Sequence, residues 1–141
     1  MAESKKTSIT VKADDDNLMT VTSAIEEAIQ GIDISPKTEM HINMSVEELF
    51  VNICHYAYEG KEGEAVVDIE VTDDPLTLFI TFKDSGTPYD PLAKDDPDVT
   101  LSAQERQIGG LGIFLVKKMM DDVIYRYENG QNILTIKKIL R

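Results

Sequence analysis

Cysteine is nearly absent from this 141-residue chain, which contains only Cys54. One cysteine cannot form an internal disulfide, so the apolar core has to stabilise the fold. The two histidines, His41 and His55, lack the spacing to a cysteine or a second histidine that is typical of zinc sites. We therefore expect a protein of a reducing, cytoplasmic compartment.

Positive charge is also scarce. The chain has 14 Lys and Arg residues against 26 Asp and Glu residues, which gives a net charge of −12. Such a surface repels nucleic acid and anionic lipid headgroups. No apolar run approaches the roughly 20 residues of a membrane-spanning helix, and the first residues lack the apolar centre of a secretion signal. We expect no direct nucleic-acid partner and no membrane contact.

Hydrophobic periodicity predicts one α+β domain over residues 1–141. Few of the expected strands are joined by helical crossovers. The fold class is therefore a two-layer α/β sandwich, with a mixed, largely antiparallel sheet and helices on one face. The expected elements are a strand at 7–12, a helix from Leu18 that stops at Gly31, a helix from Pro36 to about Tyr58, strands at 65–71 and 76–82, a helix from about Gly110 to Asp121, and strands at 123–127 and 133–139.

The segment at about 90–108 departs from this periodicity. It contains Pro91, Pro97 and scattered acidic residues. Because it is too long for an ordinary connection, we expect a mobile functional loop.

Polar side chains border the apolar stripe of the second predicted helix. At about 100° per residue, Ser45, Glu48, Asn52, His55 and Tyr56 fall within one sector. Glu48 and Asn52 lie on adjacent turns, where the Asn52 carbonyl oxygen can bind Mg²⁺ and Glu48 can accept a proton from an attacking oxygen. The alternative is a solvated helix face. We expect His55 to bond a neighbouring side chain.

Asp84 follows a predicted strand and precedes Gly86, whose missing Cβ lets the backbone turn closely around a flat ligand. The carboxylate can accept a hydrogen bond from the exocyclic amine of adenine. Guanine carries an oxygen there, so the lost bond would discriminate by about ten- to a hundredfold. The alternative is an ordinary Asp-Ser-Gly turn.

A glycine cluster opens the third predicted helix. Gly109, Gly110 and Gly112, with Leu111 among them, precede an apolar run at 113–116. Free amides at a helix start attract anions, so this segment is a candidate phosphate cradle, although a glycine cluster alone is weak evidence. Arg106 either folds onto a terminal phosphate or remains a solvated surface residue.

In this order the three elements resemble the nucleotide pocket of the GHKL ATPase superfamily, which includes gyrase-type topoisomerases and sensor histidine kinases. Within it, the ending Pro88-Tyr89-Asp90-Pro91 is similar to that of the stand-alone anti-sigma-factor serine/threonine kinases of bacterial partner-switching systems. The resemblance covers about 7–138. It implies a Bergerat-type ATP-binding fold that uses ATP and Mg²⁺.

The resemblance also implies a role for each matching residue. Glu48 becomes the catalytic base, Asn52 the Mg²⁺ ligand, and Asp84 the adenine reader. The segment at about 90–108 becomes a lid over ATP. The family often has His-Ala-Tyr where this chain has Tyr56-Ala57-Tyr58, so we do not transfer the role of that histidine to His55. The further residues implied to bind the nucleotide are Gly86, Pro88, Arg106, Gly109, Gly110, Leu111 and Gly112.

The resemblance implies an ATP-dependent protein kinase that sequesters a sigma factor or similar regulator. Its substrate would be a small STAS-type antagonist protein, phosphorylated on serine or threonine, and the kinase would be a homodimer. One alternative is a non-catalytic module whose partner affinity depends on bound ATP or ADP. Another is a ligand-free α/β interaction domain, which predicts no thermal shift with Mg-ATP.

Overall fold

A single antiparallel sheet forms one layer of the molecule. The computed structural model describes residues 4–73, 75–88, 90 and 110–140. Five strands lie in the order β1-β2-β3-β5-β4, and each neighbouring pair is antiparallel. The predicted two-layer α+β fold is confirmed. The strands are β1 (Ser4–Lys12), β2 (Glu64–Thr72), β3 (Thr77–Asp84), β4 (Asp122–Glu128) and β5 (Gln131–Ile139).

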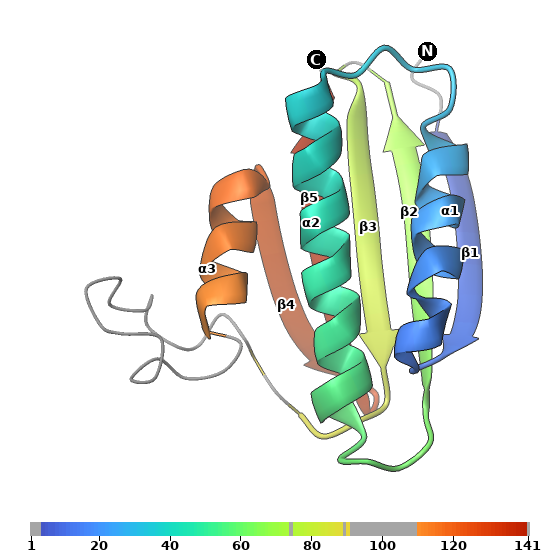
Figure 1. Cartoon of the computed structure of the whole chain (residues 1–141), viewed down its shortest axis with the longest axis vertical. Helices are drawn as coiled ribbons and strands as arrows, with labels where there is room; N and C mark the ends of the chain where they lie inside the picture. Colours follow the sequence, from blue (N-terminus) through green and yellow to red (C-terminus); the bar gives the residue numbers. More distant parts are fainter. Residues whose placement is uncertain (1–3, 74, 89, 91–109, 141) are drawn as a thin grey trace.

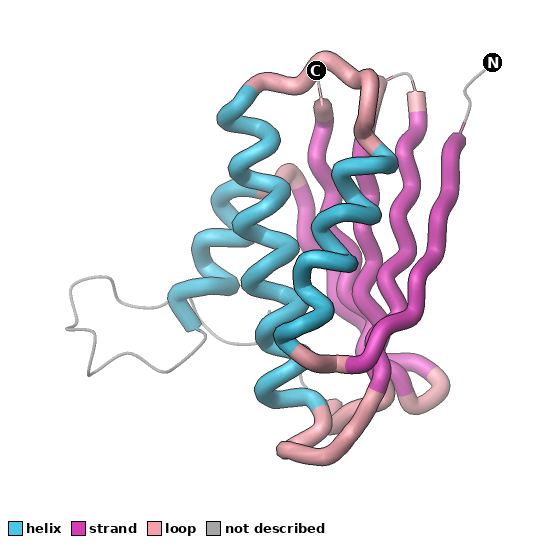
Figure 2. The backbone as a smooth tube through the Cα atoms, turned by 45° about the vertical axis from the view of Figure 1, so that its right-hand side comes forward, coloured by secondary structure: helices cyan, strands magenta, loops and turns pink. Residues whose placement is uncertain are grey.

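Three α-helices within the described residues form the second layer. They are α1 (Leu18–Ala28), α2 (Pro36–Asn52) and α3 (Gly110–Met119), and all lie on the same face of the sheet, as Figures 1 and 2 show. A short 3₁₀ turn, η1 (Asp15–Asn17), precedes α1. The residues Ser35 and Pro36 are typical of a helix start. The Ser35 side chain caps α2 by accepting a hydrogen bond from the Thr38 amide, and Pro36 takes the first helical position. No helix within the described ranges is both long and apolar enough to cross a bilayer.

The core lies between these layers. Alternate residues of β2, β3 and β5 face the helices, and the pairs Ile69–Ile80 and Ile80–Ile136 lie directly opposite one another in the ladders. Ile69, Ile80 and Ile136 are each at most 1% exposed. The helical stripe expected from the sequence is buried as well, and its members are Ile42, Val46, Leu49, Ile53 and Ala57.

The second helix ends differently from the expectation. An α-helix to about Tyr58 was predicted, but the α-helix stops at Asn52 and a π-helical turn, η2 (Ile53–Ala57), follows. The apolar stripe continues through this turn, since Ile53 and Ala57 are both 9% exposed. Periodicity therefore does not distinguish the two geometries. A π-turn inside a helix is frequently found at functional sites.

Several strand boundaries differ from the sequence-based expectation, and two of them matter for the fold and the site. Strand β1 begins at Ser4 instead of Thr7, because it pairs with β2 along its whole length, from Ser4 opposite Thr72 to Lys12 opposite Glu64. Asp84, expected just after a strand, is the last residue of β3 and pairs with Ala65 and Asn132. The ladder therefore fixes the backbone of Asp84 from both sides.

The end of α3 is held by a lysine of β5. Lys138 Nζ donates a hydrogen bond to the Met119 carbonyl at 2.5 Å and lies 3.4 Å from Nδ1 of His41 on α2. A cation at the C-terminus of a helix interacts favourably with the negative end of the helix dipole. Partial burial lowers the pKa of His41, and the ammonium groups of Lys138 and Lys37 lower it further. Lys138 thus links the sheet to two helices.

Replacement of Lys138 by methionine tests both its hydrogen bond to Met119 and its effect on the pKa of His41. We expect Lys138→Met to lower the free energy of unfolding by about 1–2 kcal/mol, because the Met119 carbonyl loses a charged donor. Removing the ammonium should also raise the pKa of His41, which NMR titration of the imidazole measures. Lys137→Met is the matched control, since Lys137 is the next residue of β5. An unchanged His41 pKa in Lys138→Met would contradict the assigned contact.

Candidate functional site

Glu48 and Asn52 lie together on the last two turns of α2. The Asn52 amide Nδ2 donates a hydrogen bond to Glu48 Oε1 at 3.2 Å, and both side chains are half-buried. This bond orients the carboxylate and turns the Asn52 carbonyl oxygen Oδ1 away from it. Oδ1 accepts no hydrogen bond from the described residues, so it is available to a ligand. The sequence predicted this proximity.

The first turn of α3 packs directly against Glu48. A Cβ atom added at Gly112 would overlap the Glu48 carboxyl group, so the absence of a side chain lets the helix start reach the carboxylate. Gly110 is the first residue of α3, and of Gly110 and Leu111 only the backbone is described. Gly109, Arg106 and the predicted lid beyond Asp90 lie outside the described residues. Within the described part, the predicted base and glycine segment therefore meet.

Asp84 is a buried carboxylate at the end of β3, with 6% of its surface exposed. Its Oδ1 accepts two hydrogen bonds, from the Gly86 amide at 3.0 Å and from Asn132 Nδ2 at 2.9 Å. The first is the bond of an ordinary Asp-Ser-Gly turn. The second comes from the neighbouring strand β5. An ordinary solvated turn would not bury the carboxylate, so the geometry is that of a shielded acceptor.

Sequence reasoning missed Asn132 and its partner Tyr125. Asn132 Nδ2 also donates to the Thr87 carbonyl at 3.0 Å, and the Tyr125 hydroxyl donates to Asn132 Oδ1. A signal was present: Asn132 occupies the inward-facing register of β5 that Leu134 and Ile136 continue. A polar residue in such a register requires a polar partner.

The turn after Asp84 rests on the end of η2. A Cβ atom at Gly86 would overlap the Ala57 carbonyl, and the Thr87 amide donates a hydrogen bond to that carbonyl at 2.8 Å. The Tyr58 hydroxyl accepts a hydrogen bond from the Ser85 amide at 2.9 Å and donates one to the Glu64 carbonyl at 2.5 Å. The predicted adenine reader is thereby joined to the helix that carries Asn52. Pro88 follows the turn and is exposed.

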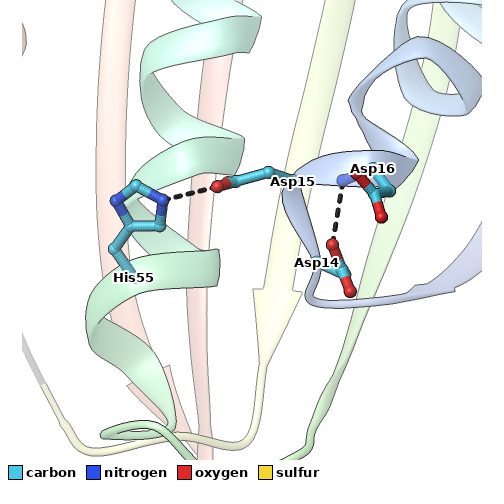
Figure 3. A network of polar contacts seen from close by, with 4 residues as sticks. All are labelled: Asp14, Asp15, Asp16 and His55. Carbon is cyan, nitrogen blue, oxygen red and sulfur yellow. Dashed lines mark hydrogen bonds and ion pairs between the residues drawn. The ribbon is translucent and has the colours of Figure 1, made fainter.

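A second contact holds η2 from the side of α1. His55 Nε2 lies 2.7 Å from Asp15 Oδ2 of η1 (Figure 3). Just before η1, the Asp14 carboxylate accepts a hydrogen bond from the Asp16 amide. His55 therefore bonds a neighbour, as expected. Burial raises the pKa of Cys54 to about 12, with the carboxylates of Asp15 and Asp14 adding to the effect. The thiol is accordingly protonated at neutral pH and is not a nucleophile.

The site offers few protein ligands to a metal ion. The described part of the chain contains no group of three or more His, Cys, Asp or Glu side chains arranged to hold a metal ion. The oxygens of Asn52 and Glu48 are hard ligands of the kind that Mg²⁺ prefers. Mg²⁺ commonly keeps several waters and takes further oxygens from substrate phosphates, so a sparse protein set fits this ion.

The sequence matches a known protein family. Residues 11–138 match the family model described as a histidine kinase-like ATPase domain. The serine-protein kinase RsbW of Listeria monocytogenes is 32% identical over 103 residues, 70% of this chain and 64% of that protein. The RsbW of Bacillus cereus is 26% identical over 104 residues, 71% of this chain and again 64% of that protein. The chain therefore matches less than two thirds of these relatives.

Solved structures support the fold alone. The RsbU and RsbW domains of a Mycobacterium tuberculosis protein superpose with a TM-score of 0.66 at 16% identity, over 96% of this chain and 32% of that one. The histidine kinase domain of a blue-light-activated kinase from Erythrobacter litoralis gives 0.53 at 18% identity, over 89% of this chain and 60% of that one.

Removal of the Tyr58 hydroxyl tests the contact between the end of η2 and the turn after Asp84. We expect Tyr58→Phe to cost about 1 kcal/mol of stability, because the Ser85 amide loses its acceptor. Hydrogen exchange at the Ser85 amide should become faster. Tyr56→Phe is the matched control, since the Tyr56 hydroxyl makes no hydrogen bond within the described residues. Equal exchange rates at Ser85 in both variants would refute the role of Tyr58.

Proposed function

This chain belongs to the histidine kinase-like ATPase domain family, and we propose that it is an ATP-dependent serine/threonine protein kinase of the anti-sigma-factor type. One observation carries the proposal. Glu48 and Asn52 of α2 contact each other, α3 starts against Glu48, and the Asp84 turn rests on the continuation of α2. The end of α2, the start of α3 and the end of β3, which carry these groups, lie toward the same end of the molecule (Figure 1).

Asp84 fits the adenine base. Its Oδ1 is occupied by two donors, whereas Oδ2 accepts no hydrogen bond from the described residues. A shielded carboxylate oxygen with free lone pairs is suited to the exocyclic amine of adenine and repels the carbonyl oxygen of guanine. The missing side chain of Gly86 lets the turn after Asp84 rest directly on the Ala57 carbonyl, which fixes the position of the turn.

Asn52 and the start of α3 fit a magnesium-bound phosphate chain. Asn52 Oδ1 would be the protein ligand of Mg²⁺, and the backbone at Gly110 and Gly112 would face phosphate oxygens with the positive end of the helix dipole. When bound, ATP supplies the phosphoryl group and Mg²⁺ offsets its charge. These groups are needed because the protein itself is strongly acidic, with a net charge of −12.

Glu48 is proposed as the base. One carboxylate oxygen is held by Asn52, which leaves the other to accept the proton of a serine or threonine hydroxyl as that oxygen becomes the nucleophile. The adjacent Gly112 keeps the helix start close to this carboxylate. A contribution of about 10²–10⁴-fold to the rate is the usual size for such a group.

The proposed partners are a sigma factor or similar regulator and a small STAS-type antagonist, which is the substrate, with the kinase acting as a homodimer. Two observations support the choice of partners: the likeness to serine-protein kinases and the charge of −12. A new phosphate on the antagonist carries about −1.5 to −2 charges, so the kinase repels its own product. A basic surface on the sequestered regulator would instead be attracted to the acidic kinase.

The base preference is the first prediction of this proposal. The parent protein should bind ATP more tightly than GTP by about ten- to a hundredfold, as measured by calorimetry with Mg²⁺ present. Asp84→Asn should weaken ATP and ADP binding alike, because both nucleotides lose the same charged acceptor. Asp73→Asn, which makes the same charge change on an exposed turn residue, is the control. Equal ATP and GTP affinities in the parent would remove Asp84 as the reader.

The second prediction separates binding from chemistry. Asn52→Ala should lose Mg²⁺-dependent ATP binding, whereas Glu48→Gln should keep binding and lose about 10²–10⁴-fold in turnover. Transfer of radiolabelled phosphate to antagonist proteins from the same operon measures turnover. Glu47→Gln is the matched control, because Glu47 is exposed on the same helix. Full turnover in Glu48→Gln would exclude Glu48 as base, and binding without any transfer in the parent would indicate a non-catalytic ATP-dependent module.

A further inference from the structure

A short chain of hydrogen-bonded polar side chains leads from half-buried Tyr125 of strand β4 to Asp84. Tyr125 of β4 donates to Asn132 of β5, and Asn132 donates to Asp84 at the end of β3. Asn132 and Asp84 are 7% and 6% exposed. We propose that Asn132 is a positioning residue that sets the base selectivity of the pocket, and that Tyr125 locks its amide. This inference rests on the proposed role of Asp84 as the adenine reader.

The partners of Asn132 fix which way its amide points. Asp84 Oδ1 and the Thr87 carbonyl lie 2.9 and 3.0 Å from Nδ2, and both atoms are acceptors. The opposite orientation would place Oδ1 against two acceptors. The Tyr125 hydroxyl meets Oδ1 on the other side. Both amide hydrogens of Asn132 are therefore used inside the protein, so the residue acts on a ligand through Asp84.

Asn132 also fixes the plane of the Asp84 carboxylate. Together with the Gly86 amide it occupies Oδ1, and this leaves Oδ2 as the oxygen for an incoming amine. The arrangement is rigid, because Asn132 is directly opposite Asp84 in the β3–β5 ladder. Tyr125 is opposite Leu134, two residues along β5 from Asn132, which puts its hydroxyl within reach across the ladder. Without Asn132, only the Gly86 amide holds the carboxylate, so its plane can turn away from the incoming amine.

A purely structural role for Asn132 makes a different prediction. A structural residue would affect every ligand of the pocket equally, whereas a residue that aims Asp84 acts only through the amine that Asp84 reads. The two roles are separated by a pair of nucleotides that differ in this amine alone. ATP carries the amine, and purine riboside triphosphate lacks it.

The experiment is calorimetry of both nucleotides with Mg²⁺ against the parent and three variants. The parent should prefer ATP over the analogue by about ten- to a hundredfold. In Asn132→Leu, which keeps the branched shape of the side chain and removes the donors, this ratio should fall to about 1–3, while the affinity for the analogue stays within about threefold. Tyr125→Phe should lower the ratio by a smaller amount. Thr135→Val should leave it unchanged, because Thr135 bonds Thr81 instead of this chain of residues.

The outcomes distinguish this inference from the proposed function. A parent ratio near one would remove Asp84 as the reader, and the inference with it. A high parent ratio that persists in Asn132→Leu, or an equal loss of both nucleotides, would overturn the inference and leave the proposed function standing. Thermal unfolding checks that each variant is folded. If Asn132→Leu does not fold, Tyr125→Phe decides alone: a lowered ratio supports the inference and an unchanged one overturns it.

Discussion

The contact between the end of α2 and the turn after β3 is the constraint on which the rest of the site depends. Gly86 fits against the Ala57 carbonyl, and the Thr87 amide bonds the same atom. This contact joins a helix that carries Glu48 and Asn52 to a strand that ends in Asp84. Because the helix and the ladder are both rigid, groups far apart in the chain keep a fixed relation. The absence of a Cβ at Gly86 makes the close approach possible.

The polar groups at this end come from several elements of the fold. Asn52 orients Glu48 within α2, the start of α3 approaches the same carboxylate, and Asn132 of β5 holds Asp84. Buried polar groups cost free energy unless they are hydrogen-bonded, so such a cluster persists only where its bonds are made. At the other end of α3, Lys138 stabilises the last turn of the helix through its hydrogen bond to the Met119 carbonyl.

Much of this arrangement could be predicted from the sequence, because the elements have strong periodicity and clear boundary signals. The apolar stripe from Ile42 to Ala57 and the helix start at Ser35-Pro36 predicted α2. The proximity of Glu48 to Asn52 then follows from helical geometry alone. The π-turn was missed because its apolar residues continue the same stripe. Asn132 was missed because its contact with Asp84 depends on the pairing of β5 with β3, which is set by the whole sheet.

The central claim is that three segments distant in the chain form one nucleotide pocket. The most direct measurement is an NMR titration of isotope-labelled protein with Mg-ATP, following the amides of Asn52, Gly86 and Gly112. The account predicts that all three signals shift along one binding curve, while amides of β1 and of the far face of the sheet stay in place. Shifts that saturate at different concentrations, or no shift at these three positions, would contradict a single pocket.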